Sequence, residues 1–344
     1  MRHWLRRANG EPLLWLLERD LQNPGVRYFT LLRLLDRSAD DSEVQRAQAD
    51  VMSDGPVPEI LAAQHPQGYW VRPGWGYSPK YRGTVWSLIS LAQLGADGHD
   101  IRVSRAAEYL LENATSPSGA FSVLENRSTA GAIHCLNGNL LAALIGLGWA
   151  GDERVQRAIE WEARVITGEG MALASEPDAP LHYYRSGSCG PGFCCSANGH
   201  KPCAWGAVKA MAAFSKLPET ARTPLVRGAI DAGVAFLLGC DPATADYPRR
   251  EGTKPSSSWF RFGFPLFYVA DVLQNVEALA ALGYGQDARL QHAVDYVLDK
   301  QDELGRWTMD HSYNGKMWVE IESKGQPSKW MTLRALQVLK AASP

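Results

Sequence analysis

The sequence has no excess of charge of either sign. Its 344 residues contain 35 lysines and arginines against 37 aspartates and glutamates, and the formal net charge is -2. A protein that neutralises a phosphate backbone carries clustered lysine and arginine, often interleaved with aromatic residues. No such basic run or stripe occurs in this chain, so we expect no nucleic-acid partner.

The chain also lacks a long hydrophobic run. No stretch reaches the roughly 20 apolar residues that a membrane-spanning helix requires. The segment MRHWLRRANGEPLLWLLERDL at the start is basic and then apolar, but Glu11 and Glu18 interrupt its apolar part. No small-residue cleavage site follows it either. We interpret the segment as a helix rather than a signal peptide and expect a cytoplasmic protein.

Apolar side chains in this first segment leave a second interpretation open. On one face of an amphipathic helix they would reach a membrane interface. They are Trp4, Leu5, Leu13, Leu14, Trp15 and Leu17. Packing of the helix on its own domain is the favoured interpretation, and peripheral membrane contact is the alternative.

Almost no segment alternates polar and apolar residues as a strand does, and four segments share a helical pattern instead. They span residues 91–103, 141–155, 211–222 and 279–290, and each reads as a helix end, a short turn and a new helix. Three copies place a glycine where a left-handed C-cap residue is needed and an aspartate near the next helix start. These residues are Gly95, Gly148, Gly283, Asp100, Asp152 and Asp287. The pattern predicts stacked helical hairpins and an all-α fold.

A second element recurs at the other end of the hairpins. Residues 64–70 and 301–307 both read Gln, four residues on Gly, and two residues further Trp, with a weaker copy at 116–121. A glycine bends the chain at such a turn while the ring packs across a helix end and the glutamine amide binds backbone groups.

These turns, the Leu-Ala-x-Leu-Gly helix ends and the final SKWMTLRALQVLK resemble the prenyltransferase and squalene-cyclase repeat superfamily. The resemblance implies an α/α toroid (α6/α6 barrel) over residues 51–344, with residues 1–50 added as an N-terminal helical cap. It also implies a cavity lined by the N-terminal ends of the inner helices. The acidic Asp-x-Asp-Asp motif of class II terpene cyclases is absent, which leaves cyclisation by that acid in doubt.

Four of the six cysteines stand between residues 188 and 206, together with one histidine. Cys203 precedes one helix that we expect to be an inner one, and Cys135 stands likewise before another. A helix N-terminus lowers the pKa of a thiol. Three sulfurs and one nitrogen would hold Zn²⁺ tetrahedrally. The predicted ligands are Cys135, Cys194 or Cys195, His200 and Cys203. Buried thiols without metal and a thiol nucleophile are the alternatives.

The segment 257–271 is dense in aromatic residues and ends in an acid. Aromatic walls suit an apolar ligand, and a carboxylic acid among them has a raised pKa and serves as a general acid. We therefore predict Asp271 and Tyr268 as catalytic residues, with Trp259, Arg261 and Phe264 in the wall. The alternative is that the rings form barrel core and Asp271 pairs with an arginine.

Further candidates precede other expected inner helices. Residues 76–86 would bind a diphosphate or carboxylate at a helix N-terminus, through Tyr77, Lys80, Tyr81 and Arg82. Trp86 is a further substrate-binding candidate in this segment. The alternative is a loop whose rings cover the barrel rim. Asn137, Asn139 and Trp205 are also expected to face the cavity.

Three functions fit these observations. The first is a terpenoid cyclase-like or prenyltransferase-like enzyme that binds an isoprenoid-like apolar ligand. The second is a binding or scaffold protein with structural zinc, for which we expect an occluded cavity. The third is a carbohydrate-active α/α-barrel enzyme, for which we expect a cleft lined by polar groups.

Overall fold

The computed structural model describes residues 3–171 and 188–343; residues 1–2 of the predicted cap and residues 172–187 and 344 of the predicted barrel lie outside them. The described residues contain thirteen α-helices. These are α1 (Pro12–Leu17), α2 (Pro24–Phe29), α3 (Ser42–Ser53), α4 (Pro56–Ala62), α5 (Thr84–Leu94), α6 (Ile101–Ala114), α7 (His134–Gly146), α8 (Glu153–Thr167), α9 (Ala204–Phe214), α10 (Pro224–Leu237), α11 (Val272–Leu279), α12 (Gln291–Leu298) and α13 (Lys329–Ala342).

The strands of the described residues are short and lie in the loops. They are β1 (Cys189–Gly190), β2 (Cys194–Cys195), β3 (Lys201–Pro202), β4 (Gly263–Phe264), β5 (Trp307–Thr308), β6 (His311–Ser312) and β7 (Pro327–Ser328). β1, β2 and β3 form an antiparallel sheet, β4 pairs with β6 in parallel, and β5 pairs with β7 antiparallel.

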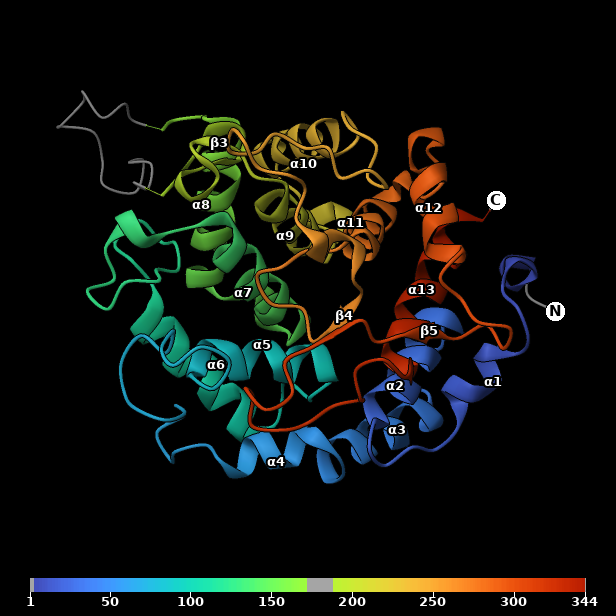
Figure 1. Cartoon of the computed structure of the whole chain (residues 1–344). Coiled ribbons are helices and arrows are strands. Elements are labelled where there is room, and N and C mark those ends of the chain that lie inside the picture. Colours follow the sequence, from blue (N-terminus) through green and yellow to red (C-terminus); the bar gives the residue numbers. More distant parts are fainter. Residues whose placement is uncertain (1–2, 172–187, 344) are drawn as a thin grey trace.

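Six helices form a closed inner ring. α5, α7, α9, α11 and α13 follow one another around it, and α2 closes it between α13 and α5 (Figure 1). A Cβ on Gly25 of α2 would lie 2.2 Å from the carbonyl oxygen of Leu94, so only glycine permits this approach. Outside the ring, α3, α4, α6, α8, α10 and α12 pack against inner helices, and α1 packs against α13. The predicted α/α toroid is confirmed.

The first 50 residues do not stand apart from the ring. α2 lies between α5 and α13, and the 3-10 turn His3–Arg7 and α1 contact α13. Where the sequence suggested a helical cap added to a complete barrel, the described part of this segment supplies one of the six inner helices. The apolar side chains of α2 would otherwise have no partner, because the ring is open without it.

The predicted helix ends are present. Gly95 and Gly148 have φ of 90° and 87°, in the left-handed region that favours glycine. Asp100 accepts a hydrogen bond from the backbone N–H of Arg102 at the start of α6, and Asp152 accepts one from Arg154 at the start of α8. Local capping therefore sets where α6 and α8 begin.

The two glutamine–glycine–tryptophan turns have the same contacts. The indole N–H of Trp70 donates to the carbonyl of Ile60, and its backbone N–H donates to Oγ1 of Thr84 on α5. Likewise, Trp307 donates to the carbonyl of Val297 and to Oγ1 of Thr332 on α13. Each turn thus ties the end of an outer helix to the start of the next inner helix.

The apolar residues of the first segment pack largely within the protein. Trp4 is buried, and the guanidinium of Arg306 lies 4.2 Å from the ring centroid of Trp15. Leu14 is exposed. In the described residues, no helix combines the length and apolar character needed to cross a membrane.

Candidate functional site

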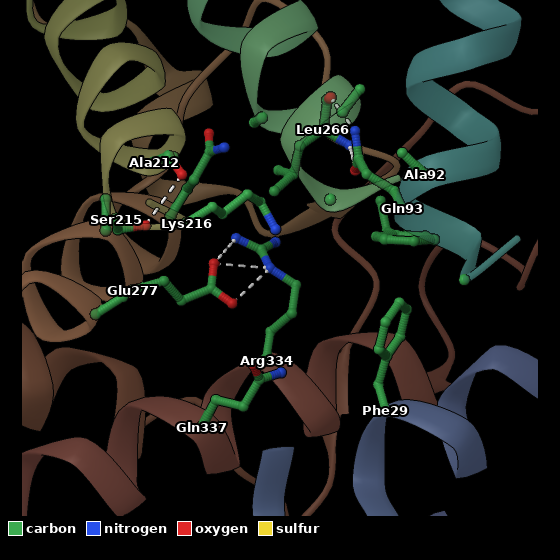
Figure 2. A pocket seen from close by; sticks show the side chains of 18 of the residues that line it. Phe29, Ala92, Gln93, Ala212, Ser215, Lys216, Leu266, Glu277, Arg334 and Gln337 are labelled. Carbon is green, nitrogen blue, oxygen red and sulfur yellow. Dashed lines mark hydrogen bonds and ion pairs between the residues drawn. The ribbon is translucent and has the colours of Figure 1, made fainter. Parts of the chain in front are cut away.

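A cavity of about 410 Å³ lies inside the ring, at the C-terminal halves of α5, α7, α9 and α11. α13 and the end of α2 complete its wall (Figure 2). The resemblance implied a cavity at the N-terminal ends of the inner helices, whereas this cavity lies toward their C-terminal ends.

The cavity exists because the inner helices carry small residues where they face it. Its wall includes Ala92, Ala96, Ala142, Ala143, Gly146, Ala212, Ala278 and Ala281. Larger side chains would fill the centre of the ring, as they do in packed interiors. The apolar wall is completed by Phe29, Phe264 and Trp330, and the last two rings stack with centroids 4.2 Å apart.

An ion pair crosses one side of the cavity. Arg334 of α13 binds Glu277 of α11 through Nε and Nη2, with Nη2 2.6 Å from Oε2 (Figure 2). Nη2 also lies 3.3 Å from Oδ1 of Asp271. Burial alone would lower the pKa of Arg334, but Glu277 and Asp271 raise it above its usual value. For the carboxylate of Glu277 burial has the opposite effect: it raises the pKa, and Arg334 offsets part of that rise. Arg334 is therefore a fixed cation of the wall.

Lys209 of α9, Lys216 just after that helix and one arginine add further positive charge. Lys209 is 1% exposed, and its Nζ donates to Oε1 of Gln274 at 2.6 Å and to the carbonyl of Val269 at 3.2 Å. Lys216 reaches the cavity from the end of α9 beside Gly146. Burial lowers the pKa of Lys209 to about 7, and desolvation by the surrounding protein together with Arg33 lowers that of the solvent-exposed Lys216 to about 8.

Arg33 follows α2 and lies over an aromatic ring of the wall. Its guanidinium carbon is 3.8 Å from the ring centroid of Phe29. Among the described residues, neither Arg33 nor Lys216 has a carboxylate within ion-pair distance, although Glu277 is close enough to affect the pKa of both. These two cations are therefore free to meet a ligand.

The amide side chains of the wall are largely occupied. Gln93 both donates to and accepts from the backbone of Leu266 at 2.7 Å, and Asn139 donates to the carbonyl of Phe267 at 2.9 Å. Gln274 accepts from Lys209. These contacts hold the segment 264–269 across the ring and leave the charged groups as the main polar feature of the cavity.

The charges of the wall do not balance. Arg33, Lys209, Lys216 and Arg334 stand against the carboxylate of Glu277. Asp271 lies behind this wall and is bound to Arg334. Arg33 and Lys216 are solvent-exposed, whereas Lys209 is buried. A buried cation without a direct counter-charge is costly, so Lys209 together with the excess of positive side chains gives the cavity the electrostatics of an anion site.

Several predicted residues meet at the opposite, N-terminal end of the inner ring. The rings of Tyr77 and Tyr81 each lie 5.4 Å from Trp86, and Tyr268 lies 5.2 Å from it. The exposed Lys80 lies 5.7 Å from the ring of Tyr268. Burial raises the pKa of Tyr268. The structure thus brings these residues together as a packed cluster, the rim arrangement that the sequence left open as the alternative.

Asp271 is buried and already bonded. Its Oδ1 accepts from the backbone N–H of Gln274 at 2.6 Å, which caps α11, and from Arg334. The pairing with an arginine that the sequence left open is therefore present. A general-acid role for Asp271 and Tyr268 stays a prediction, and neither residue belongs to the cavity wall.

The remaining predicted wall residues divide between two places. Phe264 and Asn139 line the cavity. Asn137 is fully buried and instead bonds both backbone groups of Phe121, at the third, weaker turn. Trp205 and Trp259 pack together with ring centroids 6.5 Å apart, outside the cavity wall, and Arg261 is exposed. For Asn137 the expectation was wrong, because the turn needs the same amide.

The predicted zinc ligands converge only in part. The thiol of Cys203 lies between those of Cys135 and Cys195 and interacts with both. The thiol of Cys194 points elsewhere and donates to the carbonyl of His200 at 3.1 Å. In residues 3–171 and 188–343, no group of three or more His, Cys, Asp or Glu side chains is placed to hold a metal ion. The full predicted set therefore does not fit Zn²⁺ in this arrangement, and zinc binding stays a prediction.

The thiols also differ from the expected thiolates. Interaction with Cys135, together with burial, raises the pKa of Cys203 to about 12, and contact with Cys203 raises that of Cys195. Cys135 disfavours a negative charge on Cys203, and Cys203 disfavours one on Cys195, whereas the hydrogen bond with Cys195 lowers the pKa of Cys203 in part. For Cys203 the effects of Cys135 and burial outweigh the helix N-terminus.

The charged residues of the cavity were missed from the sequence. A signal was present in the sequence. Lys209 and Lys216 interrupt the apolar segment AWGAVKAMAAFSK, and Arg334 interrupts the apolar residues of SKWMTLRALQVLK. A charge on the buried face of an inner helix requires a partner. Arg33 and Glu277 gave no comparable signal.

No family model and no curated protein match this sequence. Similar solved structures include an unsaturated glucuronyl hydrolase specific for heparin, with 11% identity, a TM-score of 0.48, and coverage of 94% of this chain and 86% of that one. The Lin0763 protein from Listeria innocua has 12% identity, a TM-score of 0.44, and coverage of 96% and 84%. A variant of the type II terpene cyclase MstE from Scytonema has 14% identity, a TM-score of 0.28, and coverage of 83% and 95%. At these values the likenesses assign neither substrate nor reaction to this chain.

Proposed function

We propose that this protein binds and acts on an organic anion with an apolar body, an isoprenoid-like phosphate or carboxylate, in the cavity of the inner ring. The observation that carries this proposal is the unbalanced charge of the wall. Arg33 and Lys216 lack carboxylate partners within the described residues, and Lys209 is bonded to neutral acceptors.

An anionic head group would pair with the solvent-exposed Arg33 and Lys216 and would offset the desolvation of the buried Lys209. Charges of opposite sign attract more strongly inside a protein than in water, because the surroundings are less polarisable. Arginine and lysine side chains at one end of a cavity suit a phosphate or carboxylate. We therefore place the head group between Arg33, Lys216 and Arg334.

The rest of the wall favours an apolar body. Phe29, Phe264 and Trp330 offer rings, and the alanines of the inner helices offer flat apolar surface. A volume of about 410 Å³ lies within the range typical of small-molecule sites, roughly 300–1,000 Å³. An occluded cavity, which the scaffold hypothesis requires, does not match this space.

An acidic sugar is the less favoured ligand. A sugar needs several free hydrogen-bonding groups for its hydroxyls, whereas Gln93, Asn139 and Gln274 already bond protein groups. Their amides would have to leave these partners, which costs hydrogen bonds that burial makes expensive.

Calorimetric titration tests the proposal with four probes: geranyl diphosphate, geraniol, inorganic pyrophosphate and glucuronate. We expect geranyl diphosphate to bind most tightly, pyrophosphate weakly, and the neutral alcohol and the sugar acid hardly at all. Lys216→Met should weaken diphosphate binding, while Lys254→Met, at an exposed position, serves as the matched control. Preference for glucuronate, or no binding of either diphosphate, would refute the proposal. Mass spectrometry of the bound probe after incubation then shows whether it is converted.

A further inference from the structure

Lys209 differs from the other cations of the cavity because it is held deep in the wall. Its helix, α9, packs tightly on α7, since a Cβ on Gly138 would lie 2.4 Å from the carbonyl carbon of Lys209. The side chain is 1% exposed and yet lines the cavity. Its position is therefore fixed by backbone packing rather than by its charge.

Both hydrogen-bond partners of Lys209 are neutral. Nζ donates to Oε1 of Gln274 and to the carbonyl of Val269. Asp271, the carboxylate that most strongly favours the ammonium of Lys209, is itself bound by Arg334 and by the N-cap contact. An ammonium in such surroundings lacks the direct counter-charge that would offset its desolvation.

The charges facing Lys209 come from three helices. Asp271 and Glu277, at the start and in the body of α11, favour the ammonium, as does Cys135 of α7. Arg334 of α13 disfavours it. Burial outweighs all of these and lowers the pKa of Lys209 to about 7.

The hydrogen bonds also match a neutral amine. A neutral amine has two N–H groups and one lone pair, and two acceptors are present. The lone pair then points in a third direction, where the nitrogen can take a proton. When the nitrogen takes a proton, the new N–H needs an acceptor, and the head group of a ligand in the cavity supplies one.

We propose that Lys209 is the acid–base residue of this cavity: with the cavity empty its amine gains and loses a proton near neutral pH, and an anionic head group that lies against it holds it protonated. In the proton transfer, the lone pair of Nζ forms the new N–H bond. When the ligand itself is the donor, the electron pair of its broken bond to hydrogen stays on the ligand as negative charge. This inference rests on the proposed function, because the ligand's charge stabilises the ammonium.

Proton uptake during binding tests the inference. The probe is decanesulfonate, an anion with an apolar chain and no titratable group near neutral pH. Its binding at pH 8 is followed calorimetrically in two buffers of different ionisation enthalpy, which gives the number of protons taken up. The Lys216→Met background removes the other lysine with a lowered pKa.

In that background we expect close to one proton per bound anion, because a group with a pKa near 7 is roughly nine-tenths neutral at pH 8. Uptake should fall as the pH is lowered through 7. The additional change Lys209→Met should abolish the uptake, and Lys209→Arg should restore binding without uptake. Circular dichroism checks that each variant is folded.

The outcomes separate this inference from the proposed function. No binding of decanesulfonate to the unchanged protein would count against the anion site itself. Binding without proton uptake in the Lys216→Met background would overturn the role of Lys209 alone. Proton uptake that persists after Lys209→Met would assign the proton to another group, and this result would also overturn the role of Lys209.

Discussion

Arg334 and Glu277 face one another across two neighbouring inner helices, with Nη2 and Oε2 2.6 Å apart. The arginine side chain is 6% exposed and the glutamate side chain 21%. The pair is thus mostly enclosed. Among the described residues that line the cavity, Glu277 is the one carboxylate beside four lysine and arginine side chains. Its loss should affect folding and ligand binding in opposite directions.

Glu277→Gln should destabilise the fold and strengthen anion binding. The free energy of unfolding is expected to fall by about 1–3 kcal/mol, because Arg334 keeps Asp271 but loses its bidentate partner. Binding of geranyl diphosphate should tighten, since a competing negative charge is removed. Urea denaturation and calorimetry measure the two effects, and weaker binding in a folded variant would contradict the anion site.

Lys216→Met should weaken binding without loss of stability. Within the described residues the side chain of Lys216 forms no hydrogen bond or ion pair that could be lost, and the surrounding protein together with Arg33 already lowers its pKa to about 8. We expect a reduction in affinity of about tenfold, equal to about 1.4 kcal/mol. The effect should shrink as salt is added if the lysine acts through charge. An unchanged affinity would place the head group away from the end of α9.

Lys209 should make the protein more stable as the pH rises above 7. Its folded pKa of about 7 lies below the unfolded value, so the unfolded chain binds more protons between these two values. Stability then rises with pH in that range, by at most about 1.4 kcal/mol per pH unit from this group. Denaturation curves at pH 7, 8 and 9 should show a smaller rise for Lys209→Met. Equal slopes for both proteins would mean that the amine stays charged.

Thr84→Val and Thr332→Val should cost similar amounts of stability. Each threonine is buried and accepts the backbone N–H of a turn tryptophan, Trp70 or Trp307. Valine keeps the shape and leaves that N–H without its acceptor, at about 1–3 kcal/mol. Thermal denaturation of the two variants tests whether the turns are energetically equivalent, and a cost at one site alone would show that they are not.

Zinc binding can be tested directly by elemental mass spectrometry of protein purified without chelator. The sequence-based prediction is about one zinc per chain, removed by His200→Ala plus Cys203→Ser. Because the thiol of Cys194 points to a carbonyl, Cys194→Ser should leave any bound metal in place. A metal-free protein with titratable thiols at Cys135, Cys195 and Cys203 would refute the prediction.

The sequence by itself determined the hairpins and their turns. Gly95, Asp100 and Trp70 act through contacts within a few residues or with the adjacent helix, and such local chemistry can be recognised from spacing. The same reasoning identified the aromatic residues around Trp86 as a group, because they precede inner helices.

Only the tertiary structure decided where the cavity lies and what charge it carries. Arg33, Lys209 and Arg334 are far apart in the chain and meet because α2, α9 and α13 belong to one closed ring. Whether space remains inside that ring depends on the sizes of side chains from all six helices together. Which end of the inner ring is filled by side chains, and which end holds the cavity, therefore depends on the packed ring as a whole and not on any single repeat.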